Sequence, residues 1–64
     1  MAEYRWILHD ASGNDLRATE PFDTKDAAEA WMGERWKSLL EEGAEEVSLR
    51  RDDALEYRMG LRPA

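Results

Sequence analysis

The chain contains no cysteine, and its 64 residues include a single histidine. Without cysteine it can form neither a disulfide nor a zinc site with thiolate ligands. A chain this short buries a modest share of its surface, so helix–sheet packing, large aromatic side chains or self-association must supply its stability. Three Trp, two Tyr and one Phe provide such side chains. We therefore expect one small domain over residues 1–64, with residues 62–64 as a frayed tail.

Basic charge and long apolar runs are also scarce. The formal net charge is −6, which opposes general binding to nucleic acid or to anionic membranes. No apolar run approaches the roughly 20 residues that span a bilayer, and the first residues lack the pattern of a signal peptide. We expect a cytoplasmic protein with no membrane partner. Seven Arg against two Lys are typical of GC-rich bacteria and indicate a bacterial origin.

The residue patterns that usually carry chemistry are missing from the sequence. His9 has no second histidine to share a metal, and it is expected at the surface. Ser12, Ser38 and Ser48 have no base beside them in the sequence that would activate a hydroxyl. The four glycines are scattered and form no phosphate-binding loop. We therefore expect no enzyme, with no catalytic residue, no metal site and no cofactor.

The segment Asp23–Gly43 predicts one amphipathic helix. Asp23 or Thr24 can cap its start, and Gly43 can adopt the left-handed conformation that ends it. Three apolar positions lie on one line of the helical wheel, and three more flank that line. The line consists of Ala28, Met32 and Leu39, and the flanking positions are Trp31, Trp36 and Leu40.

Four strands are predicted around this helix, at Glu3–Asp10, Leu16–Glu20, Glu46–Arg51 and Ala54–Leu61. Alternation of apolar and polar residues assigns one side of each strand to the core. The predicted inward residues are Tyr4, Trp6, Leu8, Leu16, Ala18, Val47, Leu49, Leu55, Tyr57, Met59 and Leu61. The fold class is α+β, a two-layer ββαββ arrangement in which one helix covers one face of a four-stranded, mainly antiparallel sheet. We favour the strand order 2-1-3-4, because it makes every neighbouring pair antiparallel.

A single helix leaves the second sheet face uncovered, and this parity gives that face five arginines against four acidic residues. The set is Glu3, Arg5, Ile7, His9, Asp15, Arg17, Thr19, Glu46, Ser48, Arg50, Glu56, Arg58 and Arg62. One interpretation is a solvated face with cross-strand Arg–carboxylate pairs. Another is a docking surface for an acidic partner or a second copy. The predicted interaction surface comprises Arg5, Ile7, His9, Arg17, Arg50, Arg58 and Trp31.

Trp31 and Trp36 lie about 140° apart around the helix axis. Both can flank the core at the sheet edges, or Trp31 can stand partly exposed and anchor a partner. The stem of Arg35 can lie over a Trp ring. The leading hypothesis is a small non-enzymatic protein-interaction domain, with a homodimer through the open sheet face or through an edge strand as one form. The alternative is a module that binds a small anion or a nucleic acid on its arginine-rich face, although the aromatic side chains needed for base stacking are assigned to the core.

Overall fold

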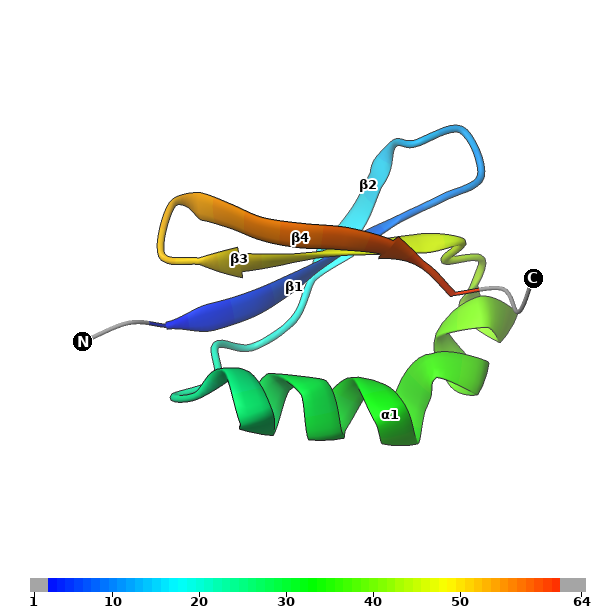
Figure 1. Cartoon of the computed structure of the whole chain (residues 1–64). Coiled ribbons are helices and arrows are strands. Elements are labelled where there is room, and N and C mark those ends of the chain that lie inside the picture. Colours follow the sequence, from blue (N-terminus) through cyan, green and yellow to red (C-terminus); the bar gives the residue numbers. More distant parts are fainter. Residues whose placement is uncertain (1–2, 62–64) are drawn as a thin grey trace.

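The computed structural model describes residues 3–61 and contains four strands and one helix (Figure 1). The strands are β1 (Tyr4–His9), β2 (Asp15–Ala18), β3 (Glu46–Arg51) and β4 (Ala54–Gly60), and the helix is α1 (Lys25–Glu42). The sheet has the order β2-β1-β3-β4, and each neighbouring pair is antiparallel. The predicted α+β fold and strand order are therefore confirmed. The predicted tail at 62–64 lies outside the described residues.

Helix α1 begins and ends where the capping residues place it. The hydroxyl of Thr24 accepts a hydrogen bond from the Ala27 N–H, and Gly43 takes a left-handed conformation with φ of 107°. Ala28, Met32 and Leu39 are buried, while Trp31, Trp36 and Leu40 pack partly buried beside them. The predicted core stripe is thus confirmed. Within residues 3–61, no helix is long and apolar enough to cross a membrane.

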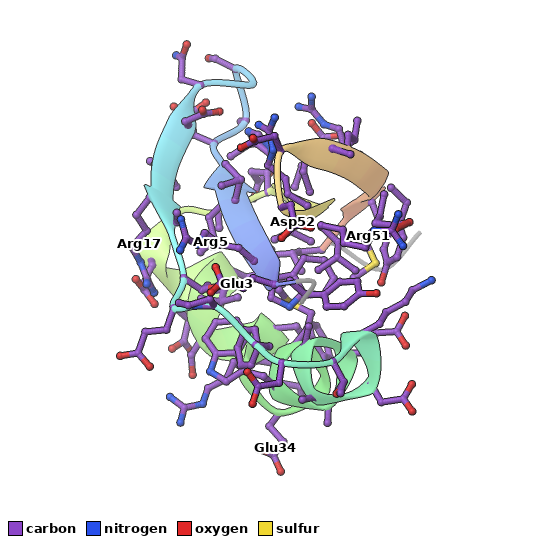
Figure 2. The ribbon with its side chains drawn as sticks, turned by 90° about the vertical axis from the view of Figure 1, so that its left-hand side faces the viewer. Glu3, Arg5, Arg17, Glu34, Arg51 and Asp52 are labelled. Carbon is purple, nitrogen blue, oxygen red and sulfur yellow. The ribbon has the colours of Figure 1, made fainter. Side chains whose placement is uncertain are left out.

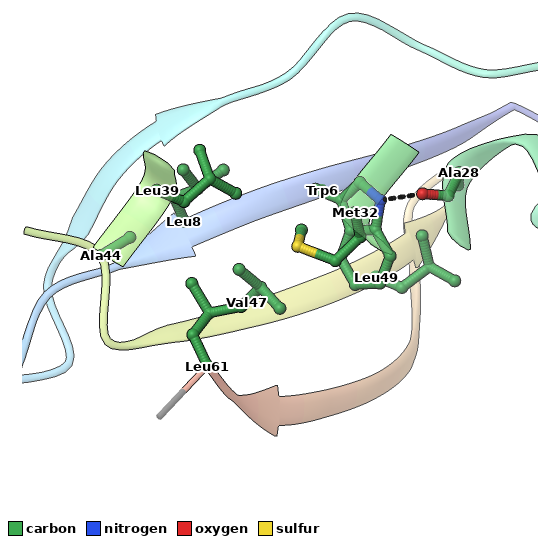
Figure 3. Close-up of a cluster of buried hydrophobic side chains, with 9 residues drawn as sticks. All are labelled: Trp6, Leu8, Ala28, Met32, Leu39, Ala44, Val47, Leu49 and Leu61. Atoms are coloured by element: carbon green, nitrogen blue, oxygen red, sulfur yellow. Dashed lines mark hydrogen bonds between the residues drawn. The ribbon is translucent and has the colours of Figure 1, made fainter. Parts of the chain in front are cut away.

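The core lies between this stripe and one face of the sheet (Figures 1 and 3). Trp6 is fully buried, and its indole Nε1–H donates a 2.8 Å hydrogen bond to the backbone oxygen of Ala28. That oxygen belongs to the helix, so the bond fixes the distance between helix and sheet at the centre of the core. Val47, Leu49 and Leu8 belong to the same buried cluster as Trp6 and come from the strands, as predicted.

The predicted parity of strand β2 is wrong. A register shift after Leu8 places Arg17 opposite Leu8, on the helix side, and Ala18 opposite Ile7, on the open side. Leu16 is 46% exposed instead of inward. This strand is short and contains one strongly apolar residue, so its alternation specifies its register poorly.

Thr19 follows this strand and is buried, although it was expected on the open face. Its hydroxyl accepts a hydrogen bond from the Trp6 N–H and donates one to the Glu20 carbonyl. The side chain therefore satisfies backbone groups just after β2 ends.

A second register shift corrects the prediction for Leu55. Tyr57 and Met59 lie opposite Leu49 and Val47, on the helix side, but the shift beyond Leu49 places Leu55 opposite Arg50. Leu55 is consequently 60% exposed on the uncovered side of the sheet. An inserted residue reverses the alternation of a strand, and no pattern of apolar residues marks where the insertion occurs.

Candidate functional site

Two arginines face each other on the two middle strands of the uncovered sheet face, near one end of the sheet. Arg5 on β1 lies directly opposite Arg50 on β3, and both are exposed. Arg50 donates a 3.3 Å hydrogen bond to the Asp53 carbonyl. Within residues 3–61, neither guanidinium forms an ion pair with a carboxylate. Like charges directly opposite each other on neighbouring strands destabilise a sheet, so we expect this pair to carry a cost.

A shallow hollow of about 480 Å³ lies beside this arginine pair. Its lining combines the two arginines and the partly buried Ile7 with Glu3, Asp52 and Asp53. Asp52 is engaged locally, because its Oδ1 accepts a 3.0 Å hydrogen bond from the Glu3 N–H. Figure 2 labels Arg5, Glu3 and Asp52 near this end of the sheet. The lining of the hollow therefore combines two guanidinium groups, one isoleucine and three acidic side chains.

The other end of the open face holds a buried hydrogen bond that the sequence did not predict. His9 is 7% exposed and Ser48 is 5% exposed, so the expectation of a surface histidine is wrong. His9 Nε2 and Ser48 Oγ share a hydrogen bond of 2.7 Å, in which the donor depends on the imidazole tautomer. Asp15 Oδ1 lies 2.9 Å from His9 Nδ1, but the two atoms are not aligned for a hydrogen bond.

Hydroxyl, imidazole and carboxylate in this order resemble the arrangement of a serine nucleophile. A nucleophile must meet its substrate, and Ser48 is almost completely covered. The carboxylate also fails to orient the imidazole through a hydrogen bond. The geometry therefore favours a structural role, in which His9 and Ser48 fill the open face and satisfy each other. Pairing of β1 with β3 brings these residues together from 39 positions apart, so no local sequence signal could reveal them.

Arg58 completes this end of the face. It lies opposite Ser48, and its Nη2 forms a 2.8 Å ion pair with Glu46. Both side chains are roughly half exposed, so the pair contributes at most about 1 kcal/mol to stability. Of the predicted surface, Arg5, Ile7, His9, Arg50 and Arg58 do share one face. Among the described residues, its three arginines stand against Glu3, Asp15 and Glu46. Arg62, which the prediction also assigned to this face, lies outside the described residues.

Arg17 and Trp31 do not belong to that face. Arg17 reaches toward the helix and forms a 3.1 Å ion pair with Glu42. Trp31 packs on Phe22, with 5.7 Å between ring centroids. The guanidinium carbon of Arg35, rather than its stem, lies 5.9 Å from the Trp31 ring centroid. Arg17, Trp31 and Arg35 share the lining of a separate hollow of about 390 Å³, beside β2. Trp31 therefore flanks the core at this edge of the sheet.

An apolar groove lies on the opposite side, between α1 and β4. It has a volume of about 300 Å³, and most of its lining is apolar or aromatic. Its lining residues are Trp6, Glu29, Met32, Gly33, Trp36, Tyr57, Met59, Gly60 and Leu61. Met59 is 38% exposed at its border. A Cβ added to Gly33 would meet no atom within 4 Å, so the absent side chain leaves the groove wider.

Tyr57 is part of the lining of this groove. Its hydroxyl donates a 2.9 Å hydrogen bond to Glu29 Oε2 on the helix. Burial raises the pKa of Tyr57 to about 12, and the hydrogen bond and the negative charge of Glu29 act in the same direction. Tyr57 therefore stays a neutral donor at physiological pH and links β4 to α1.

Within the described part of the chain, no three His, Asp or Glu side chains come together as metal ligands would. In comparisons with protein-family models, curated proteins and solved structures, no match was found.

Proposed function

We propose that this chain is a non-enzymatic protein-interaction domain whose uncovered sheet face binds an acidic segment of another protein. The observation that supports this proposal is the pair of opposed arginines, Arg5 and Arg50, which lack a carboxylate partner. A partner carboxylate placed between them would relieve their repulsion and form bidentate hydrogen bonds. The partly buried Ile7 and the exposed Leu55 offer apolar contact area on the same face.

A charge-reversed double variant tests this proposal. Wild-type protein, Arg5→Glu/Arg50→Glu and a matched control, Arg17→Glu/Arg51→Glu, are used to capture partners from lysate of the source organism. The control changes charge equally, but its arginines pair with Glu42 and Glu56 away from this face. We expect one captured protein to bind the wild type and the control and to be lost from the double variant. Equal capture by all three proteins would contradict the proposal.

Stability gives a second, partner-independent readout. Arg50→Glu gives Arg5 an opposite charge across the strand pair, and such a pair is more favourable by about 0.2–1 kcal/mol. We expect this variant to unfold at higher urea concentration than the wild type while it loses partner binding. A stability gain combined with a loss of binding would identify the arginine pair as a site maintained for recognition. An unchanged or lower urea midpoint would contradict a net stabilisation from replacing one arginine of the pair by a carboxylate.

Binding of a small anion or a nucleic acid is the second candidate function. The two guanidinium groups at the hollow favour it, whereas Glu3, Asp52 and Asp53 around the same hollow oppose it. The buried Trp6 and the Tyr57 ring belong to the helix side, where they cannot stack on bases bound to the open face. Titration with inorganic phosphate and with a short single-stranded oligonucleotide, followed by backbone amide shifts, separates the candidates. Shifts concentrated at Arg5 and Arg50 would favour the anion module.

A further inference from the structure

We infer that two copies of this chain pair through the free edge of β4, joining their sheets into one continuous antiparallel sheet. This inference uses a surface separate from the arginine pair, so either proposal can fail while the other stands. β4 is the last strand of the sheet, and no strand within residues 3–61 covers its outer edge. An uncovered edge presents backbone N–H and C=O groups that can pair with another strand.

The hydrogen bonds of β4 show which backbone groups are available. The Leu61 N–H donates to the Glu45 carbonyl, toward β3. Backbone groups alternate in direction along a strand, so those of Met59 also face β3, while those of Arg58 and Gly60 face outward. The register shift of the β3–β4 pair lies between Tyr57, which is opposite Leu49, and Leu55, which is opposite Arg50. It therefore falls before the segment 57–60. The segment from Tyr57 to Gly60 is therefore a regular edge with free hydrogen-bonding groups.

The side chains of this segment suit a two-fold axis at Met59. With the axis there, Met59 lies opposite Met59 of the second copy, and Tyr57 lies opposite Leu61 of that copy. Both contacts are apolar and lie on the helix side. Arg58 then lies opposite Gly60 of the second copy. An axis at Arg58 would instead oppose two like charges, which is unfavourable. The sequence of β4 is thus self-complementary in one register, as a two-fold interface requires.

The apolar groove strengthens the inference. Pairing at this edge brings a second β4 beside the border where Met59 is 38% exposed, next to Trp36 and Gly33. The two grooves then meet across the axis, on the same side of the joined sheet. Each chain carries a charge of −6, so the copies repel each other at long range. Because salt screens this repulsion, we expect added salt to strengthen the dimer.

Sedimentation of the full chain tests the inference, from low micromolar to near-millimolar concentration. We expect the wild type to reach twice the mass of one chain. Met59→Lys should remain monomeric, and Leu16→Lys should behave as the wild type. Leu16 is a matched control, because it is comparably exposed on the opposite edge strand. A wild type that stays monomeric throughout, or a dimer that survives Met59→Lys, would overturn the inference.

Cross-linking tests the register without depending on dimer strength. The chain has no cysteine, so Met59→Cys introduces one thiol per chain. Directly opposed residues at such a position have Cα atoms about 4.5 Å apart, within the range of a disulfide. We expect rapid disulfide-linked dimers from Met59→Cys and none from the control Leu16→Cys. The reverse pattern would overturn the inference.

The arginine variants separate this inference from the proposed function. Arg5→Glu/Arg50→Glu should form the dimer as the wild type does, even if it loses an acidic partner. Loss of the dimer in that variant alone would place self-association on the open face and overturn pairing through β4.

Discussion

At the scale of single residues, buried hydrogen bonds on the open face contribute to the stability of the sheet. His9 and Ser48 are buried on a sheet face that has no helix over it, and each provides the hydrogen-bond partner of the other. A buried polar group that loses its partner costs more than the bond contributes when it is intact. These two side chains therefore stabilise the strand pair β1–β3 from the side opposite the core.

Substitution of Ser48 by alanine tests this contact. Ser48→Ala leaves His9 Nε2 without its partner, and we expect a loss of about 1–3 kcal/mol in the free energy of unfolding. Ser38→Ala, at an exposed position of α1, serves as the control and should leave stability nearly unchanged. Urea denaturation followed by tryptophan fluorescence measures both. Equal stability of the two variants would contradict a structural role for the His9–Ser48 bond.

Tyr57 gives a dependence of stability on pH with a definite sign. Its pKa is about 12 in the folded protein and near 10 in the unfolded chain. Between these values the folded state holds the proton more tightly, so the stabilisation present below pH 10 is lost as the pH rises toward 12. Tyr57→Phe has no proton to lose. As the pH rises from 8 toward 12, the urea midpoint should fall more steeply for the wild type than for Tyr57→Phe. Parallel curves would contradict the raised pKa of Tyr57.

At the scale of elements, two glycines of the helical segment have opposite roles. Gly33 lies inside α1, where a Cβ would meet nothing within 4 Å. Gly43 ends the helix with φ of 107°, a backbone conformation that residues with a Cβ rarely adopt. The same substitution should therefore change stability in opposite directions at the two positions.

Alanine at each position tests this difference directly. Gly33→Ala should raise the free energy of unfolding by about 0.5–1 kcal/mol, because alanine favours the helix. Gly43→Ala should lower it by about 1 kcal/mol or more, because its backbone would be strained. Thermal unfolding by circular dichroism measures both changes. A lower free energy of unfolding for Gly33→Ala would contradict this prediction, and would mean that the groove closes around position 33.

The elements also show where sequence reasoning succeeds. Helix α1, strand β3 and the hairpin order follow from patterns repeated over many residues, such as the line of Ala28, Met32 and Leu39. The faces to which the side chains of β2 and of the start of β4 point do not follow from such patterns. One inserted residue in the β1–β2 pair and one in the β3–β4 pair reverse the alternation. Arg17 and Leu55 were placed on the wrong face for this reason.

At the scale of the whole molecule, the proposed function depends on surfaces that form only when segments distant in the sequence meet. Arg5 and Arg50 were each predicted on the open face, but their direct opposition depends on the register of β1 with β3. The groove between α1 and β4 likewise requires the helix position, which Trp6 fixes through its bond to Ala28. The proposed sites therefore depend on one arrangement, in which α1 covers one face of the sheet and leaves the other uncovered.

A nuclear Overhauser spectrum of the wild-type protein tests that arrangement most directly. We predict cross-peaks from the Trp6 indole to Met32 and Ala28. We also predict cross-peaks between the Arg5 and Arg50 side chains, with none from either arginine to α1. Cross-peaks from Arg5 or Arg50 to helix residues, together with the absence of contacts between Trp6 and Met32, would contradict the account.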